Sequence, residues 1–486
     1  MNKSLSTVIL AAVAFFLLPS IALAAGGGDA SLPPIDHTRH WLGYTCLAIF
    51  VVSYALVMSE EFIHLRKSKP ALLAAGLIWA LIAGVGQTTG HADAINAAVR
   101  HNILEYAELM LFLLVAMTYI NAMAERNVFN ALRSFLVRKE YSFRQLFWIT
   151  GVLSFFISPI ADNLTTALVM CAVVLAVGGD NKKFIGIACV NIVVAANAGG
   201  AFSPFGDITT LMVWQKGIVQ FKEFLALFFP SVVNYIIPAF IMSFFVPKVQ
   251  PHSDGEEIKM KLGAKRTMVL FLLTIWTAVC FHNFLHLPPM VGMMAGLAYL
   301  QFFGFYLKMQ GKKAIARNAP EEELNHIMAD YSEGPSMGAP GQYDIFKKVA
   351  GAEWDTLLFF YGIILAVGGL GYIGYLAGVS EFMYGQMGPT FANVMVGILS
   401  AIVDNIPVMF AVLTMQPDMS LNQWLLVTLT AGVGGSMLSI GSAAGVALMG
   451  QAHGKYTFFG HLKWAPVIAL GYVASIYAHI WINGLA

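Results

Sequence analysis

Residues 158–163 read SPIADN and residues 400–405 read SAIVDN, and both hexapeptides lie in the middle of apolar stretches. Each gives the pattern Ser-x-x-x-Asp-Asn, so an acidic residue recurs at membrane depth in two parts of the chain. Ionisable side chains are costly there and usually belong to an ion or proton pathway. Downstream, the glycines at 199, 200 and 206 are matched at the same spacing by glycines at 434, 435 and 441. The repeat predicts that two halves of the chain build one polar centre, as in secondary transporters.

The composition is that of an integral membrane protein. Hydrophobic residues make up 58% of the chain and charged residues 11%, against about 25% charged in an average soluble domain. The net charge of +1 gives no reason to expect nucleic acid as a partner. The four cysteines are scattered through apolar runs without metal or disulfide spacing. We therefore expect an all-α polytopic membrane protein surrounded by lipid.

The N-terminus has the layout of a signal peptide. Residues 1–24 contain Lys3, an apolar run from residue 8 to residue 23, and an Ala-x-Ala site at residues 22–24. Cleavage would leave the mature N-terminus outside the membrane. The alternative is an uncleaved first span.

Eight further apolar runs are long enough to span a bilayer. They lie near residues 41–59, 70–86, 102–123, 225–246, 267–285, 288–306, 356–379 and 464–482. The segments 147–177 and 387–416 are interrupted by proline beside the Asp-Asn pairs, and we interpret them as re-entrant hairpins. The segments 184–216 and 421–450 are interrupted by glycine clusters, and we interpret them as discontinuous helices.

The distribution of lysine and arginine predicts the topology. With the N-terminus outside, 23 of the 28 Lys and Arg residues fall in loops on the inside. Treating either hairpin as a full span would invert every later loop. Assigning each loop in turn to one side of the membrane gives the two halves opposite orientations, which predicts inverted repeats. We divide the chain into N-terminal spans (25–99), a first repeat (100–246), linking spans with a cytoplasmic loop (247–351) and a second repeat (352–486).

Polar residues gather at the predicted hairpin tips and helix breaks. Carboxylate, amide and hydroxyl oxygens of this kind suit a hard monovalent cation. The four broken segments hold no Lys, Arg or His away from their ends, so an anion would meet three buried carboxylates with nothing to offset them. The candidate cation ligands are Asp162, Asn163, Thr166, Asn197, Asp207, Thr209, Thr210, Ser400, Asp404, Asn405, Ser439 and Ser442.

These acidic residues have two interpretations. Each aspartate could cap the helix that follows it. Each could also bind a proton and a cation in competition, which would couple the two fluxes as exchange. Four further acids near span ends are either structural or part of a proton relay. They are Glu105, Glu108, Glu353 and Asp355.

The segments 158–166, 197–210, 400–407 and 432–442 resemble NhaD-type sodium/proton antiporters of the ion transporter superfamily. The resemblance covers the chain after the signal. It implies a secondary active antiporter, not an enzyme, that exports Na⁺, and by extension Li⁺, in exchange for protons without a cofactor. It further implies a homodimer in the bacterial inner membrane, with a scaffold domain and a transport domain in each protomer.

Other functions remain as alternatives. Relatives in the same superfamily carry organic anions such as citrate, but they place Ser-Asn-Thr where this chain has Asp162-Asn163 and Asp404-Asn405. An arsenite transporter is the stronger rival, because a neutral substrate tolerates acids. A passive channel gains nothing from two oppositely opening hairpins, and the sequence has no Walker-type phosphate loop for an ATPase.

The predicted topology can be tested by cysteine labelling. Cysteines introduced at Asn181 and His252 are expected to react only from the cytoplasmic side, and cysteines at Lys222 and Gln386 only from outside. An impermeant maleimide applied to intact cells and to inverted vesicles measures this. Labelling of position 181 from outside would mean that residues 147–177 cross the membrane, and the inverted-repeat prediction would be wrong.

Overall fold

The computed structural model describes residues 36–63, 65–139, 141–248, 257–261, 263–318 and 345–485. The predicted signal at residues 1–24, His252 and residues 319–344 of the predicted cytoplasmic loop lie outside these ranges. The regular structure of the described residues is helical and contains no strand. The all-α prediction is confirmed.

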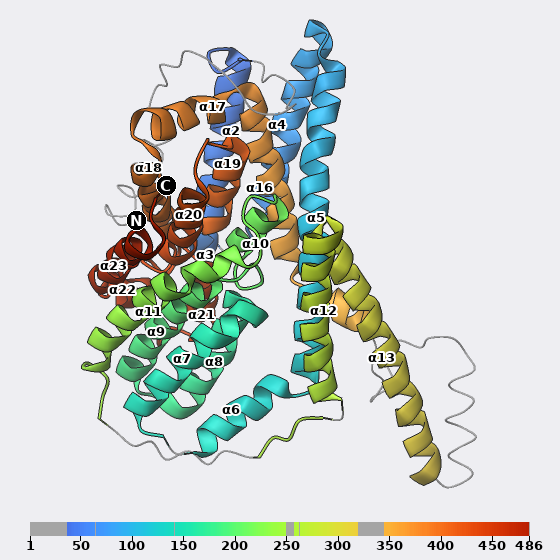
Figure 1. Cartoon of the computed structure of the whole chain (residues 1–486), viewed down its shortest axis with the longest axis vertical. Coiled ribbons are helices and arrows are strands. Elements are labelled where there is room, and N and C mark those ends of the chain that lie inside the picture. Colours follow the sequence, from blue (N-terminus) through green and yellow to red (C-terminus); the bar gives the residue numbers. More distant parts are fainter. Residues whose placement is uncertain are drawn as a thin grey trace. The chain divides into compact units, whose positions relative to one another are not determined.

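The helices divide between two compact units, drawn together in Figure 1. The first unit contains the described residues up to Leu109, from Arg133 to Glu257 and from Trp354 onward, and the second contains Met110–Leu132 and Ile258–Glu353. In chain order the first half holds α2 (Trp41–Met58), α3 (Glu60–Ile63), α4 (Ser68–Thr89), α5 (Ala92–Glu125), α6 (Val128–Arg138), α7 (Phe143–Ala161), α8 (Asn163–Gly178), α9 (Lys182–Gly200), α10 (Ile208–Gln215), the 3₁₀ turn η1 (Glu223–Leu227) and α11 (Phe228–Ser243). There follow α12 (Ala264–Leu285), α13 (Pro289–Asn318), α15 (Ile345–Ala350), α16 (Trp354–Ile373), α17 (Tyr375–Ser380), the π-helical turn η2 (Glu381–Gln386), α18 (Pro389–Ile402), α19 (Asn405–Met415), α20 (Leu421–Gly434), α21 (Ala443–Gln451), α22 (Phe458–Leu462) and α23 (Ala465–Asn483).

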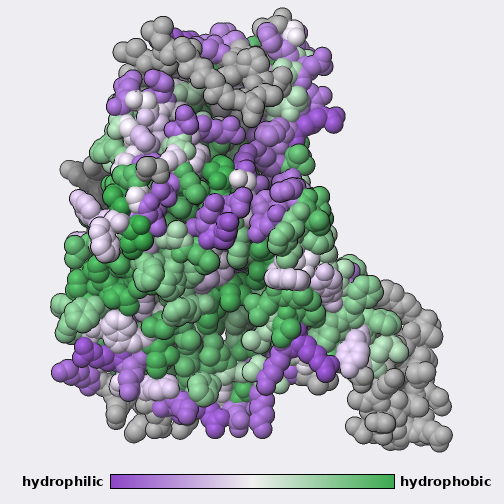
Figure 2. Space-filling view, in the orientation of Figure 1, coloured by the Kyte–Doolittle hydropathy of each residue, from purple (hydrophilic) through white to green (hydrophobic). Residues whose placement is uncertain are grey.

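Within the described residues, ten helices are long and apolar enough to cross a membrane. They include all eight predicted spans, together with α7 and α9. Large apolar side chains on the first unit are exposed, as Figure 2 shows for the face in view, and they suit contact with lipid. Examples are Phe156, Phe229, Phe240, Phe244 and Trp481. The chain is a multi-pass membrane protein.

Each predicted hairpin is a helix–turn–helix. α7 ends at Ala161 and α8 begins at Asn163, with the single residue Asp162 between them at φ 57° and ψ 161°. The matching pair is α18 and α19, separated by Val403 and Asp404. Their extents, 143–178 and 389–415, are close to the predicted ones. That the two hairpins re-enter the membrane from opposite sides stays a prediction.

Each predicted discontinuous helix has an interruption at its glycine cluster. Seven residues separate α9 from α10, and eight separate α20 from α21. Asp207 is the N-cap of α10 and Ser442 the N-cap of α21, so these matched positions have the same role. α7 and α8 pack on α9, and α18 packs on α20 (Figure 1). The inverted relation between the halves remains a prediction.

The serine of each Ser-x-x-x-Asp-Asn motif joins its hairpin to the neighbouring broken helix. Ser158 Oγ donates to Ala196 O at 2.6 Å, and Ser400 Oγ donates to Ala431 O at 2.7 Å. Both serines are fully buried. The two halves therefore use the same local contact, which places the Asp-Asn turn beside the start of the break.

Close backbone packing accompanies this contact. A Cβ atom added at Gly199 would lie 2.2 Å from Phe155 O, and one added at Gly434 would lie 2.1 Å from Gly397 O. Only a hydrogen side chain fits where the backbones of α7 and α9, or of α18 and α20, approach so closely. These glycines fix the distance between hairpin and broken helix in each half.

Alanine at either glycine is expected to destabilise the protein. Gly199→Ala and Gly434→Ala should each lower the free energy of unfolding by about 1–3 kcal/mol, because the backbones must separate. Gly450→Ala is the control, since an added Cβ there has no neighbour within 4 Å. Thermal unfolding in detergent measures the effect. Wild-type melting temperatures for both packed-glycine variants would contradict the close approach.

Candidate functional site

The centre of the site is the carboxylate of Asp207 at the break between α9 and α10. Its side chain is 4% exposed, and Oδ1 accepts a hydrogen bond from the backbone N–H of Thr209 at 3.0 Å. A buried carboxylate away from water is costly unless donors or a cation satisfy it. The capping interpretation is correct for Asp207, but the cap uses one donor and leaves the second oxygen to other partners.

The first hairpin supplies one of these partners. Asn163, the first residue of α8, donates from Nδ2 to Asp207 Oδ2 at 2.9 Å and to Asn197 Oδ1 at 3.1 Å. Its backbone N–H donates to Gly206 O at 3.0 Å. The hairpin tip is thus joined to the α9–α10 break by both backbone and side chain.

The second hairpin supplies a matching partner. Asn405, the first residue of α19, donates from Nδ2 to Asp207 Oδ2 at 3.1 Å. The two asparagines hold equivalent positions in the repeated motif, and both are buried. One carboxylate oxygen therefore receives an amide from each half of the chain, and the two halves meet at one polar centre.

The second broken helix reaches the same network through Ser436. Asn197 Nδ2 donates to Ser436 Oγ at 3.0 Å, and both side chains are fully buried. Asn197 also accepts from Asn163, so its amide links the hairpin of the first half to the break of the second. The two hairpins and the two broken helices are therefore joined by this set of hydrogen bonds.

The other two predicted carboxylates cap helices. Asp162 accepts from the backbone N–H of Thr165 at 2.7 Å and from its hydroxyl at 3.0 Å. Its φ of 57° is rare for a residue with a side chain and costs about 1–3 kcal/mol, a strain that functional turns often carry. Asp404 accepts from the backbone N–H of Ile406 at 3.3 Å. Both are half-buried, unlike Asp207.

The predicted hydroxyl ligands are buried, and several are engaged within their own segments. Thr210 donates to the carbonyl oxygens of Ser203 and Asp207, while Ser439 donates to Met449 Sδ at 3.2 Å. Ser442 caps α21 and Ser400 donates to Ala431 O, as described above. By contrast, Thr166 Oγ1 is buried and makes no hydrogen bond with the described residues.

The hydroxyls of Thr166 and Thr209 are both buried. Thr166 lies one turn after Asn163 on α8, and Thr209 is two residues after Asp207. A buried hydroxyl without a partner normally costs about 1–3 kcal/mol. Such an oxygen could instead coordinate a bound cation. Among the described residues, no three His, Cys, Asp or Glu side chains form a metal cluster.

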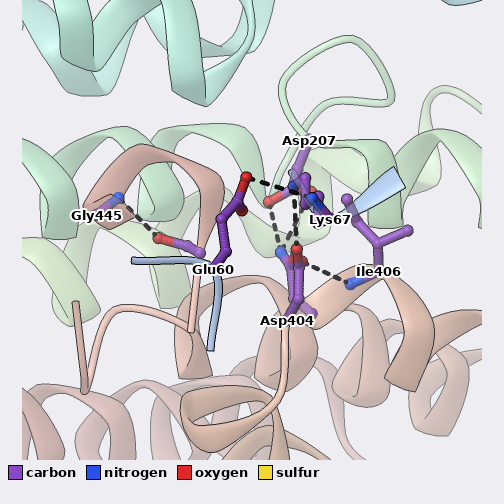
Figure 3. Close-up of polar contacts among 8 residues, drawn as sticks. Glu60, Lys67, Asp207, Asp404, Ile406 and Gly445 are labelled. Atoms are coloured by element: carbon purple, nitrogen blue, oxygen red, sulfur yellow. Dashed lines mark hydrogen bonds and ion pairs between the residues drawn. The ribbon is translucent and has the colours of Figure 1, made fainter. Parts of the chain in front are cut away.

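One positive charge was missed in the sequence. Lys67, in the connection before α4, places Nζ 3.7 Å from Asp404 Oδ2, as Figure 3 shows. The expectation that nothing offsets the buried acids is therefore wrong for Asp404. The four broken segments indeed carry no base near the site, but the base comes from another part of the chain. No periodicity or motif around Lys67 signals this contact.

The acids near span ends are engaged in structural contacts. Glu105 pairs with the Nζ of Lys216, just after α10, and lies 2.7 Å from His101 Nε2. Asp355 accepts from the hydroxyl of Ser68 at the start of α4. These contacts join α5 to α10 and α16 to α4. The proton-relay alternative for Glu105, Glu108, Glu353 and Asp355 stays a prediction.

Known proteins resemble the chain over nearly its full length. A family profile described as "Citrate transporter" matches residues 54–432. The chain is 62% identical over 454 residues to the "Na(+)/H(+) antiporter NhaD" of Alkalimonas amylolytica, covering 93% of each protein. It is 61% identical over 450 residues to the protein of the same name from Vibrio cholerae, covering 92% of this chain and 94% of that one. It is 30% identical over 451 residues to "Sodium/proton antiporter 1" of Arabidopsis thaliana, covering 90% and 72%.

The central position of Asp207 gives a binding prediction. Asp207→Asn should weaken sodium binding about a hundredfold or more, because the change removes the charge and leaves two amide donors facing an amide. Isothermal titration calorimetry on purified protein measures this. Asp180→Asn, at a fully exposed loop carboxylate, is the control and should bind as the wild type does. Wild-type sodium affinity in Asp207→Asn would reduce that acid to a helix cap.

Proposed function

The chain belongs to the NhaD type of Na⁺/H⁺ antiporters and exchanges sodium ions for protons across a membrane, and we propose that both ions use one shared site centred on Asp207. The observation that carries the proposal is the pair of amides, from Asn163 and Asn405, on a single buried carboxylate oxygen. Each amide stands at the tip of a different hairpin. The site is thus sensitive to the position of both halves.

The exchange follows from the cost of a buried charge. A carboxylate at membrane depth is neutralised either by a proton or by a bound cation, and the two exclude each other. If the protein changes between its inward-open and outward-open states only while a proton or a cation is bound, this competition produces antiport. Hydrogen bonds from Asn163, Asn405 and Thr209 orient the Asp207 carboxylate in either case.

Alternating access requires a part of the chain that can move as a unit. We assign this role to the two hairpins and the two broken helices, which are linked by the Ser158–Ala196 and Ser400–Ala431 contacts. Inverted orientation of the halves would open the site to one side and then to the other. On this proposal the remaining spans form the scaffold, and two protomers associate through it in the bacterial inner membrane with the N-terminus in the periplasm.

The ligand set favours sodium, and by the same chemistry lithium, over an anion. The positive side chain near the site, Lys67, is already paired with Asp404. An organic anion would therefore meet the negative Asp207 with no free partner of opposite charge among the residues that contact it here. Transport of arsenite or of an organic anion is not favoured, and no cofactor is needed for the exchange.

Competition at one carboxylate predicts how sodium affinity depends on pH. As pH rises, fewer protons occupy the site, so the apparent sodium KM should fall by close to tenfold per pH unit for each proton displaced. It should level off once the site is deprotonated. Sodium-induced collapse of an imposed proton gradient in inverted vesicles, followed at several pH values, measures this.

An amide variant provides the matched control for that experiment. Asn405→Ala should raise the sodium KM at every pH, because it removes a donor that orients Asp207, yet it should keep the pH slope because the amide does not titrate. A sodium KM that stays constant with pH in the wild type would contradict the shared site and favour separate routes for the two ions.

A further inference from the structure

Lys67 is held in a fixed position by contacts with three parts of the first unit. Its Nζ lies 4.5 Å from the centroid of the Phe359 ring on α16 and 3.7 Å from Asp404 Oδ2 at the start of α19. Its backbone N–H donates to Glu60 Oε1 at 3.3 Å (Figure 3). The side chain is 18% exposed. Lysine is seldom so buried unless a specific partner retains it.

The partner, Asp404, has both oxygens occupied. Oδ1 accepts the N–H of Ile406 and Oδ2 faces the ammonium of Lys67. Asp404 is also the residue next to Asn405, whose amide donates to Asp207. A second carboxylate thus stands one residue away from the proposed sodium site, engaged with a cation that belongs to the protein.

We propose that Lys67 is a positioning residue that holds Asp404 out of the cation site and competes with the transported sodium ion for that carboxylate. The proposal rests on the proposed function, in which sodium binds at Asp207. Without Lys67, Asp404 is free to add a second negative charge to the site. With Lys67 in place, sodium meets the charge of Asp207 and a neutralised Asp404, and it binds less tightly.

Weaker binding has a use in transport. A site with two unpaired carboxylates attracts a monovalent cation strongly and releases it slowly, whereas a tethered ammonium offsets one of the charges without leaving the protein. Lys67 therefore favours release of sodium at the cost of affinity. A purely structural ion pair would only hold the loop before α4 against α19. Its removal would not raise sodium affinity while slowing sodium release.

The test separates sodium affinity from maximal rate. Lys67→Gln should lower the apparent sodium KM by about threefold to tenfold and lower the maximal exchange rate, because one nearby positive charge is lost. Lys67→Arg should keep both values near those of the wild type. Lys69→Gln removes a charge from an exposed side chain two residues away and should change neither value. Inverted vesicles with an imposed proton gradient give the two parameters.

A double variant shows whether Lys67 acts through Asp404. In an Asp404→Asn background, Lys67→Gln should produce no further fall in KM. An unchanged or raised KM in Lys67→Gln, or a fall of the same size in the Asp404→Asn background, would overturn the proposal and leave a structural ion pair. Calorimetry of sodium binding to purified Lys67→Gln protein supports the proposal if affinity rises and contradicts it if affinity does not.

These outcomes are distinct from a failure of the proposed function. If the wild type does not couple sodium to proton movement, or if Asp207→Asn binds sodium normally, the shared site at Asp207 is wrong whatever Lys67 does. If the wild type couples the two ions and Asp207→Asn loses sodium binding, the response of Lys67→Gln alone decides the role of Lys67.

Discussion

The carboxylate of Asp207 is buried among helices with one oxygen shared by amides from two hairpins, and this constraint governs the arrangement around it. An unpaired carboxylate in such surroundings costs several kcal/mol. Each hydrogen bond to a charged group contributes about 1.5–3 kcal/mol, and Asn163, Asn405 and Thr209 provide three. Both hairpin turns and the α9–α10 break are needed to bring these donors together, and the second break joins the network through Ser436 and Asn197. The interruptions of the helices thus follow from the need to satisfy one acid.

The same constraint relates structure to exchange. Because the donors come from two halves, a movement of either hairpin changes the surroundings of the carboxylate and so the balance between its occupants. The glycine contacts at Gly199 and Gly434 keep each hairpin at a fixed distance from its broken helix. The geometry within each half is therefore stiff, and the adaptable contacts are those that the halves make to each other through Asp207 and Ser436.

Much of this architecture could be predicted from the sequence, because its causes are local or periodic. Apolar length predicted the spans, and the repeated Ser-x-x-x-Asp-Asn motif predicted two turns that face one centre. Asp162 shows the limit of such reasoning. Asp162 and Asp207 both cap helices, and only the structure shows that Asp207 also receives amides from the two hairpins while Asp162 accepts from Thr165.

The contact of Lys67 with Asp404 could not be predicted for a related reason. The two residues are 337 positions apart, and the lysine comes from a connection that carries no motif, so its place depends on how α4 and α16 pack. Ser436 is likewise absent from the predicted ligands, which near the second break are Ser439 and Ser442, because nothing in the local sequence distinguishes these serines. In each case the deciding interaction joins segments whose relative position has no signature in the local sequence.

The shared oxygen of Asp207 also has a consequence for how the protein is made. Its amide donor Asn405 lies 198 residues further along the chain, so it leaves the ribosome long after Asp207 has reached the translocon. During that interval the first half contains a carboxylate whose final partner does not yet exist. Until then the acid has only the donors of its own half, Asn163 and Thr209. The network around Asp207 is therefore complete only once the second half of the chain, with Asn405 and Ser436, is in place.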